Sequence, residues 1–123
     1  MSDELKIVER TVAYSLRVIR LYKELRKDEV GRVLGRQLLR AGTSIGANVH
    51  EAQSAQSKAD FIAKIYIAMK EARECLYWLR LIREAQVIRP KLLESLVDET
   101  AQIAKILTSI LLTAKQRAKA AHS

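Results

Sequence analysis

The sequence has little of what β-structure and disulfide scaffolds need. Its 123 residues include one proline, four glycines, one cysteine, one tryptophan and one phenylalanine. A β-sandwich or barrel requires turn residues roughly every ten positions, so the scarcity of glycine and proline excludes these folds. Cys75, as the only cysteine, can form no internal disulfide, and we expect a reducing cytoplasm as its compartment.

Membrane and targeting patterns are also missing. The uncharged stretches, such as residues 106–114, are much shorter than the roughly 20 apolar residues that a spanning helix needs. The first four residues, Met-Ser-Asp-Glu, are polar and acidic, unlike a signal or transit peptide. We therefore expect a cytoplasmic protein with no membrane partner.

The sequence shows little sign of an enzyme. Its glycines lie in a helical pattern with no strand before them, unlike a phosphate-binding loop. Its two histidines and one cysteine have no metal-coordinating spacing. Arg117 and His122 have the Arg-x4-His spacing of HEPN-type ribonucleases, and a histidine can act as general acid or base on RNA. This pair lies in an alanine- and lysine-rich tail, so we keep the ribonuclease as an alternative and predict a non-enzymatic protein without metal or cofactor.

What the sequence has in excess is positive charge on a globular composition. Apolar residues make up 49% and charged residues 29% of the chain, as in folded proteins. The length fits one domain spanning residues 1–123. The formal net charge is +8 and the pI is about 9.9. The basic residues are spread along the chain, which favours nucleic acid or another anionic surface as a partner.

Four helices are predicted, at about residues 2–27, 29–55, 58–86 and 90–118. Asp28 and Glu29 open the second, and Ser57 with Asp60 has the spacing of a capping box before the third. Pro90 occupies a first helical position before the fourth. Connections this short make consecutive helices antiparallel. The fold class is therefore all-α, an up-down-up-down four-helix bundle.

Two helices carry more apolar surface than one core needs. The first has a core seam and a second seam that includes Val12 and Leu16, and together they exceed the arc of about 100° that a surface helix buries. This second seam indicates either a central helix or contact with another subunit. On the third helix, Ile67, Trp78 and Leu81 face away from the expected core and are candidate contacts between copies.

The second helix holds all four glycines on one face, spaced by four, seven and four residues. Each costs roughly 1 kcal/mol in a helix relative to alanine, which indicates close approach of another helix. We assign Gly42 and Gly46 to the interface between copies.

Arginines one turn apart mark the other side of this helix. Arg32, Arg36 and Arg40 span about 12 Å, which suits a phosphate backbone. The alternative is a solvated face or salt bridges to acidic neighbours. The candidate nucleic-acid contacts are Arg10, Arg17, Arg20, Arg32, Arg36 and Arg40.

Residues 37–51 read Gln-Leu-x-Arg-Ala-x-x-Ser-Ile-x-x-Asn-x-x-Glu. This pattern, with the following stretches 57–61 and 67–74, resembles the signature of the four-helix bundle proteins also called 23S rRNA-intervening-sequence proteins. Several matching positions are polar, which helical bundles in general do not require. We expect these polar residues to form a structural network, with a direct ligand role as the alternative. Its members are Arg40, Ser44, Asn48, Glu51, Glu71 and Glu74.

The resemblance also implies partners. It implies a bacterial, cytoplasmic protein that forms a ring-like homo-oligomer, often a homopentamer. A similar protein is the accessory subunit of diversity-generating retroelements, where it binds nucleic acid and a reverse transcriptase. The resulting hypothesis is an oligomeric protein that binds nucleic acid, RNA in preference to DNA, through basic helix faces. The alternative is a protein–protein interaction adaptor built on the Trp78 surface, with no nucleic-acid role.

Overall fold

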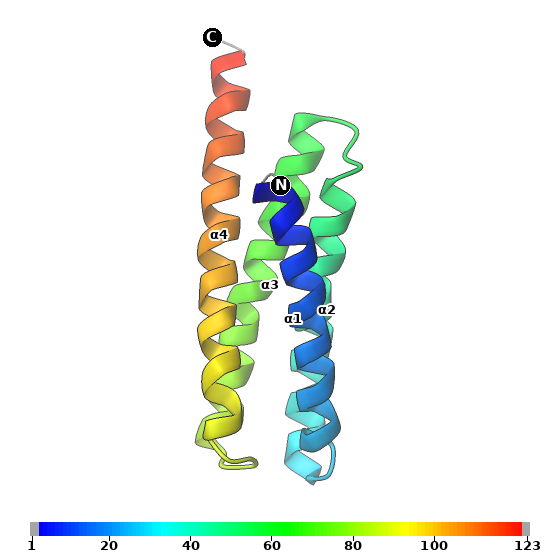
Figure 1. Cartoon of the computed structure of the whole chain (residues 1–123), viewed down its shortest axis with the longest axis vertical. Coiled ribbons are helices and arrows are strands. Elements are labelled where there is room, and N and C mark those ends of the chain that lie inside the picture. The colour runs from blue at the N-terminus through cyan, green and yellow to red at the C-terminus, as the bar shows by residue number, and fades with distance from the viewer. Residues whose placement is uncertain (1–2, 122–123) are drawn as a thin grey trace.

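The computed structural model describes residues 3–121, which form four helices and no strand (Figure 1). They are α1 (Asp3–Leu25), α2 (Glu29–Ala52), α3 (Lys58–Glu84) and α4 (Lys91–Ala121). Each end lies within three residues of the predicted one. The all-α prediction is confirmed.

Consecutive helices run in opposite directions along one long axis (Figure 1). Packing is extensive between α1 and α2, between α2 and α3, and between α3 and α4, whereas α1 and α4 contact each other much less. The last turns of α4 extend past the ends of the other helices (Figure 1). No helix in the described part of the chain has the length and hydropathy of a membrane span.

Local chemistry sets the helix ends. Asp28 caps α2, where its Oδ2 accepts a 2.8 Å hydrogen bond from the Gly31 amide. Ser57 Oγ accepts from the Asp60 amide at 3.0 Å, and Asp60 Oδ2 accepts from the Gln56 amide at 3.2 Å, so both begin α3 as predicted. After α3, Gln86 adopts a left-handed conformation with φ of 58°, a helix-ending position that glycine usually occupies.

The core lies along the axis between the four helices. Its largest fully buried side chains include Tyr14, Leu38, Ile65, Leu79 and Ile103. Tyr14 Oη and Thr100 Oγ1 lie 2.7 Å apart in a hydrogen bond that joins α1 to α4. Among the described residues, no buried side-chain nitrogen or oxygen is left without a hydrogen-bond partner. The core therefore satisfies the rule that buried polar groups are paired.

The glycines of α2 face α1 of the same chain. A Cβ added at Gly42 would lie 3.0 Å from both Cγ atoms of Val18, and one at Gly46 would lie 3.3 Å from the Thr11 carbonyl oxygen. The prediction of close helix approach is confirmed, but the assignment of Gly42 and Gly46 to an interface between copies is wrong. The space beside them is filled within one chain.

Candidate nucleic-acid interface

Two of the six candidate arginines join α1 to α4. Arg10 donates from Nε and Nη2 to both carboxylate oxygens of Glu99, at 2.8 and 2.7 Å, and from Nη2 to Gln102 Oε1 at 2.8 Å. These bonds from Arg10 lower the pKa of Glu99 below its ordinary value. Arg17 Nη2 donates to Ser95 Oγ at 2.7 Å. The guanidinium of Arg10 in particular is occupied within the bundle, which disfavours it as a phosphate contact.

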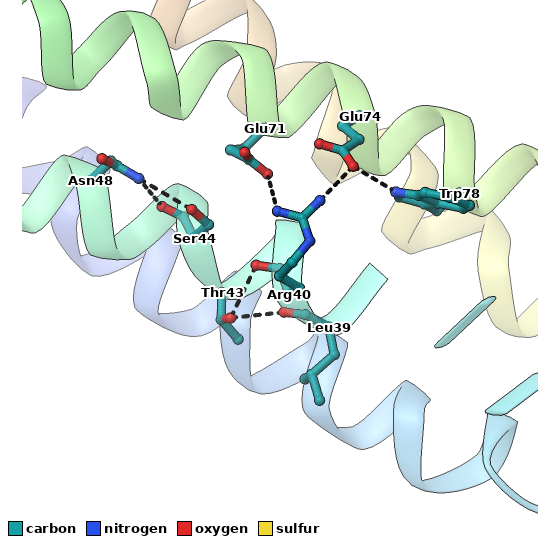
Figure 2. Close-up of polar contacts among 8 residues, drawn as sticks. All are labelled: Leu39, Arg40, Thr43, Ser44, Asn48, Glu71, Glu74 and Trp78. Atoms are coloured by element: carbon teal, nitrogen blue, oxygen red, sulfur yellow. Dashed lines mark hydrogen bonds and ion pairs between the residues drawn. The ribbon is translucent and has the colours of Figure 1, made fainter. Parts of the chain in front are cut away.

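A third candidate, Arg40, joins α2 to α3 (Figure 2). Its Nη1 donates to Glu71 Oε2 at 3.4 Å, and its Nη2 donates to Glu74 Oε1. The indole Nε1 of Trp78 donates to the same Glu74 oxygen at 3.1 Å. Burial, followed by the charge of Glu74, raises the pKa of Glu71. Arg40, Glu71 and Glu74 thus form a polar group that joins α2 to α3, as expected for part of a structural network.

The rest of the predicted polar network is separate. Asn48 Nδ2 donates to the Ser44 carbonyl at 2.9 Å and to Ser44 Oγ at 3.2 Å, within α2 (Figure 2). Glu51 pairs instead with Lys64 of α3 at 3.4 Å. The six residues therefore form three local groups, two of which connect α2 to α3.

The other three candidate arginines remain on the surface. Arg20 on α1 and Arg32 and Arg36 on α2 are exposed. None of their side chains takes part in an ion pair within the described part of the chain. These three guanidinium groups are free to contact an anionic partner.

The predicted contact surface on α3 is less open than expected. Ile67 is 40% exposed, but Trp78 is half-buried and packs against the core, and Leu81 is also half-buried. Because Trp78 packs against the core, the prediction that it faces away from the core is wrong. Other apolar groups are more exposed than Ile67, and two of them lie on the second seam of α1, where Val12 is 50% and Leu16 48% exposed.

The site residues predicted from the sequence do not include a mixed aromatic and basic surface on α3. Five residues spaced by four, three, four and three positions lie on one face of the helix at 100° per residue, and all five are exposed. We name this set the α3 stripe. It consists of Tyr66, Lys70, Arg73, Tyr77 and Arg80. Its heptad spacing is visible in the sequence, but it does not stand out as an apolar face because three of its five residues are basic.

No group of three or more His, Cys, Asp or Glu residues that could hold a metal ion occurs between residues 3 and 121. Burial raises the pKa of the Cys75 thiol to about 12, so it stays protonated at neutral pH and is a poor nucleophile. Arg117 is exposed near the end of α4, and His122 of the ribonuclease alternative lies outside the described residues.

The chain is similar to known proteins both in sequence and in fold. Residues 3–109 match the family model of the 23S rRNA-intervening sequence protein. The crystal structure of a protein of unknown function from the S23 ribosomal protein family of Bacteroides thetaiotaomicron is 40% identical, with a TM-score of 0.85. The similarity covers 89% of this chain and 98% of that chain. A search among curated proteins finds no match. The chain belongs to the family of 23S rRNA-intervening sequence proteins.

Proposed function

We propose that this protein is a self-associating, non-enzymatic protein that binds nucleic acid, with RNA favoured over DNA. The observation that carries the proposal is the exposure of Arg20, Arg32 and Arg36 without an acidic partner among the described ion pairs. The chain has a net charge of +8, and unpaired surface cations gain free energy by releasing counterions from phosphates. The family name, which refers to rRNA, favours RNA.

Self-association is supported by the exposed apolar groups of α1. Val12 and Leu16 lie one helical turn apart and are each about half exposed. A second copy packed against them would remove this apolar surface from water. The resemblance to family members favours a ring, often of five copies. Repetition of the basic faces around such a ring would multiply the contacts to one nucleic acid.

Binding assays at two salt concentrations test the proposal. We expect RNA to bind at about 50 mM salt and to bind at least tenfold more weakly at about 200 mM, because phosphate contacts release counterions. The double variant Arg32→Glu and Arg36→Glu should weaken binding and keep the helical circular dichroism signal. The matched control is Arg89→Glu with Lys91→Glu, an equal charge change at exposed positions near the start of α4.

The outcomes separate the proposal from its alternatives. Equal loss in both double variants would mean that net charge, not the α2 face, determines binding. No binding to RNA or DNA at low salt would refute the proposal and leave the adaptor, whose main residue, Trp78, is half-buried. RNA cleavage that is lost in His122→Ala would instead favour the ribonuclease.

A further inference from the structure

The α3 stripe exposes two tyrosine rings to solvent. Tyr66 is 43% and Tyr77 55% exposed. Tyr77 also packs edge-on against Trp78, with ring centroids 5.1 Å apart and an angle of 70° between the rings. Trp78 is in turn held by its hydrogen bond to Glu74. The stripe therefore presents one tyrosine supported by a fixed neighbouring ring.

Lysines from two helices gather at the other ring. Lys70 Nζ lies 5.4 Å from the centroid of Tyr66, and Lys115 Nζ of α4 lies 5.8 Å from it. Both distances are within the range of cation–π attraction. Lys115 belongs to the last turns of α4, beyond residue 109 where the family match ends. Two flexible ammonium groups thus lie over the Tyr66 ring, and a base that stacks on this ring displaces at least one of them toward the phosphates.

The acidic residues of this part of α3 point elsewhere. Glu71 and Glu74 are turned toward α2, where both accept hydrogen bonds from Arg40 (Figure 2). The exposed cations Lys70 and Arg73 between the two tyrosines are in none of the ion pairs described for residues 6–121. Arg80 pairs with Glu84 at 3.2 Å in an exposed contact, which is weak and easily exchanged. The stripe is therefore positively charged along its length.

From these contacts we infer that the α3 stripe, together with Lys115, binds single-stranded RNA by stacking unpaired bases on Tyr66 and Tyr77. Lys70, Arg73 and Lys115 contact the phosphates. This inference rests on the proposed function and specifies its ligand. A duplex hides the faces of its bases, whereas a single strand offers them to aromatic side chains. The two tyrosines are eleven residues apart, about 16 Å along the helix, which is close to the length of five stacked nucleotides at about 3.4 Å each.

The test separates stacking from charge. In the variant Tyr66→Leu with Tyr77→Leu, apolar bulk and net charge stay but the rings are lost. The control, Tyr66→Phe with Tyr77→Phe, keeps the rings. The probes are an oligoadenylate of about 12 nucleotides, within known single-strand site sizes, and a duplex RNA and a single-stranded DNA of equal length. We expect the leucine variant to lose at least about fivefold in affinity for the oligoadenylate for each ring removed. Its binding to the duplex and its midpoint of thermal unfolding should not change. The phenylalanine variant should bind like wild type.

Each contrary result has a distinct meaning. Unchanged single-strand binding in the leucine variant, with wild-type binding intact, overturns stacking and leaves the proposed function standing. An equal loss for single strand and duplex overturns it as well, because stacking acts only on unpaired bases. Tighter binding of the single-stranded DNA than of RNA overturns the choice of RNA. A smaller oligomer mass in the leucine variant would show that a second copy covers the stripe. Absence of any nucleic-acid binding by the wild-type protein removes the proposed function itself.

Discussion

Arg40 and Trp78 lie on different helices but donate hydrogen bonds to the same oxygen atom, Oε1 of Glu74. Arg40 comes from α2 and Trp78 from α3, so one carboxylate both links the two helices and holds the indole N–H (Figure 2). Arg40 belongs to the residues by which the chain resembles its family. Because its guanidinium pairs with Glu71 and Glu74, Arg40 supports a structural role for this position of the family pattern.

The first prediction concerns Trp78. The variant Trp78→Phe keeps most of the apolar contact with the core but loses the N–H donor, so we expect the free energy of unfolding to fall by about 1 kcal/mol. Chemical denaturation monitored by circular dichroism measures this change. Oligomer mass in light scattering should remain that of wild type. A drop in mass at unchanged stability would instead place Trp78 at a contact between copies.

The second prediction concerns the apolar groups of α1. The double variant Val12→Lys and Leu16→Lys should lower the oligomer mass in light scattering, because burying two ammonium groups between copies costs several kcal/mol. Both side chains are about half exposed, so the helices themselves should still form. The control is Val30→Lys with Val33→Lys, which adds the same charge at valines that are 52% and 59% exposed on α2. Equal effects in the two variants would argue against an interface at α1.

Helix positions could be predicted from the sequence because local chemistry determines them. Asp28 and Ser57 accept hydrogen bonds from the first turn of the helices that follow them, and both are recognisable from their residue type and spacing. Pro90 likewise precedes α4 by one residue. None of these signals depends on the rest of the chain.

The role of each charged or glycine residue could not be predicted in the same way, because it depends on which helix lies opposite. Arg10 and Glu99 are 89 positions apart in the sequence, and no pattern within α1 distinguishes Arg10 from the exposed Arg20. Periodicity places Gly42 on a face of α2, but only the structure shows that Val18 of the same chain fills the space beside it. Trp78 illustrates the same limit, since its ring packs partly on the core from a position that an angular plot puts outside.

The third prediction compares two glycines on one face. A Cβ at Gly31 would overlap the backbone carbonyl oxygen of Leu25, whereas at Gly46 its nearest neighbour would be 3.3 Å away. Alanine is better than glycine in a helix by about 1 kcal/mol. We therefore expect Gly46→Ala to stay within about 1 kcal/mol of wild type, and Gly31→Ala to lose about 1–3 kcal/mol through overpacking against a backbone that cannot easily move. Urea denaturation of the two variants gives the comparison. Equal stabilities would mean that the turn between α1 and α2 relaxes freely.

The fourth prediction concerns the pH dependence of stability at the contact of Arg10 with Glu99. The bonds from Arg10 hold the pKa of Glu99 below its ordinary value of 4.5, so this contribution is present above pH 4.5 and is lost as the pH falls through the lowered pKa. Glu99→Gln should reduce the free energy of unfolding at pH 7 by about 1 kcal/mol. This loss is smaller than for a fully buried pair, because water screens the partly exposed contact. The difference from wild type should shrink as the pH falls below 4.5.

The pKa of Glu71 is shifted in the opposite direction to that of Glu99, so the pH dependence of its contribution is also opposite. Its pKa is raised, mainly by burial, so its contribution is present below its ordinary pKa of 4.5 and is lost as the pH rises through the raised value. Relative to wild type, Glu71→Gln should therefore become more stable as the pH rises above 4.5, whereas Glu99→Gln should become less stable as the pH rises toward 4.5 from below. Denaturation curves collected at several pH values for the two variants would reveal these trends. Parallel trends would show that net charge, and not the specific surroundings of each carboxylate, governs the response to acid.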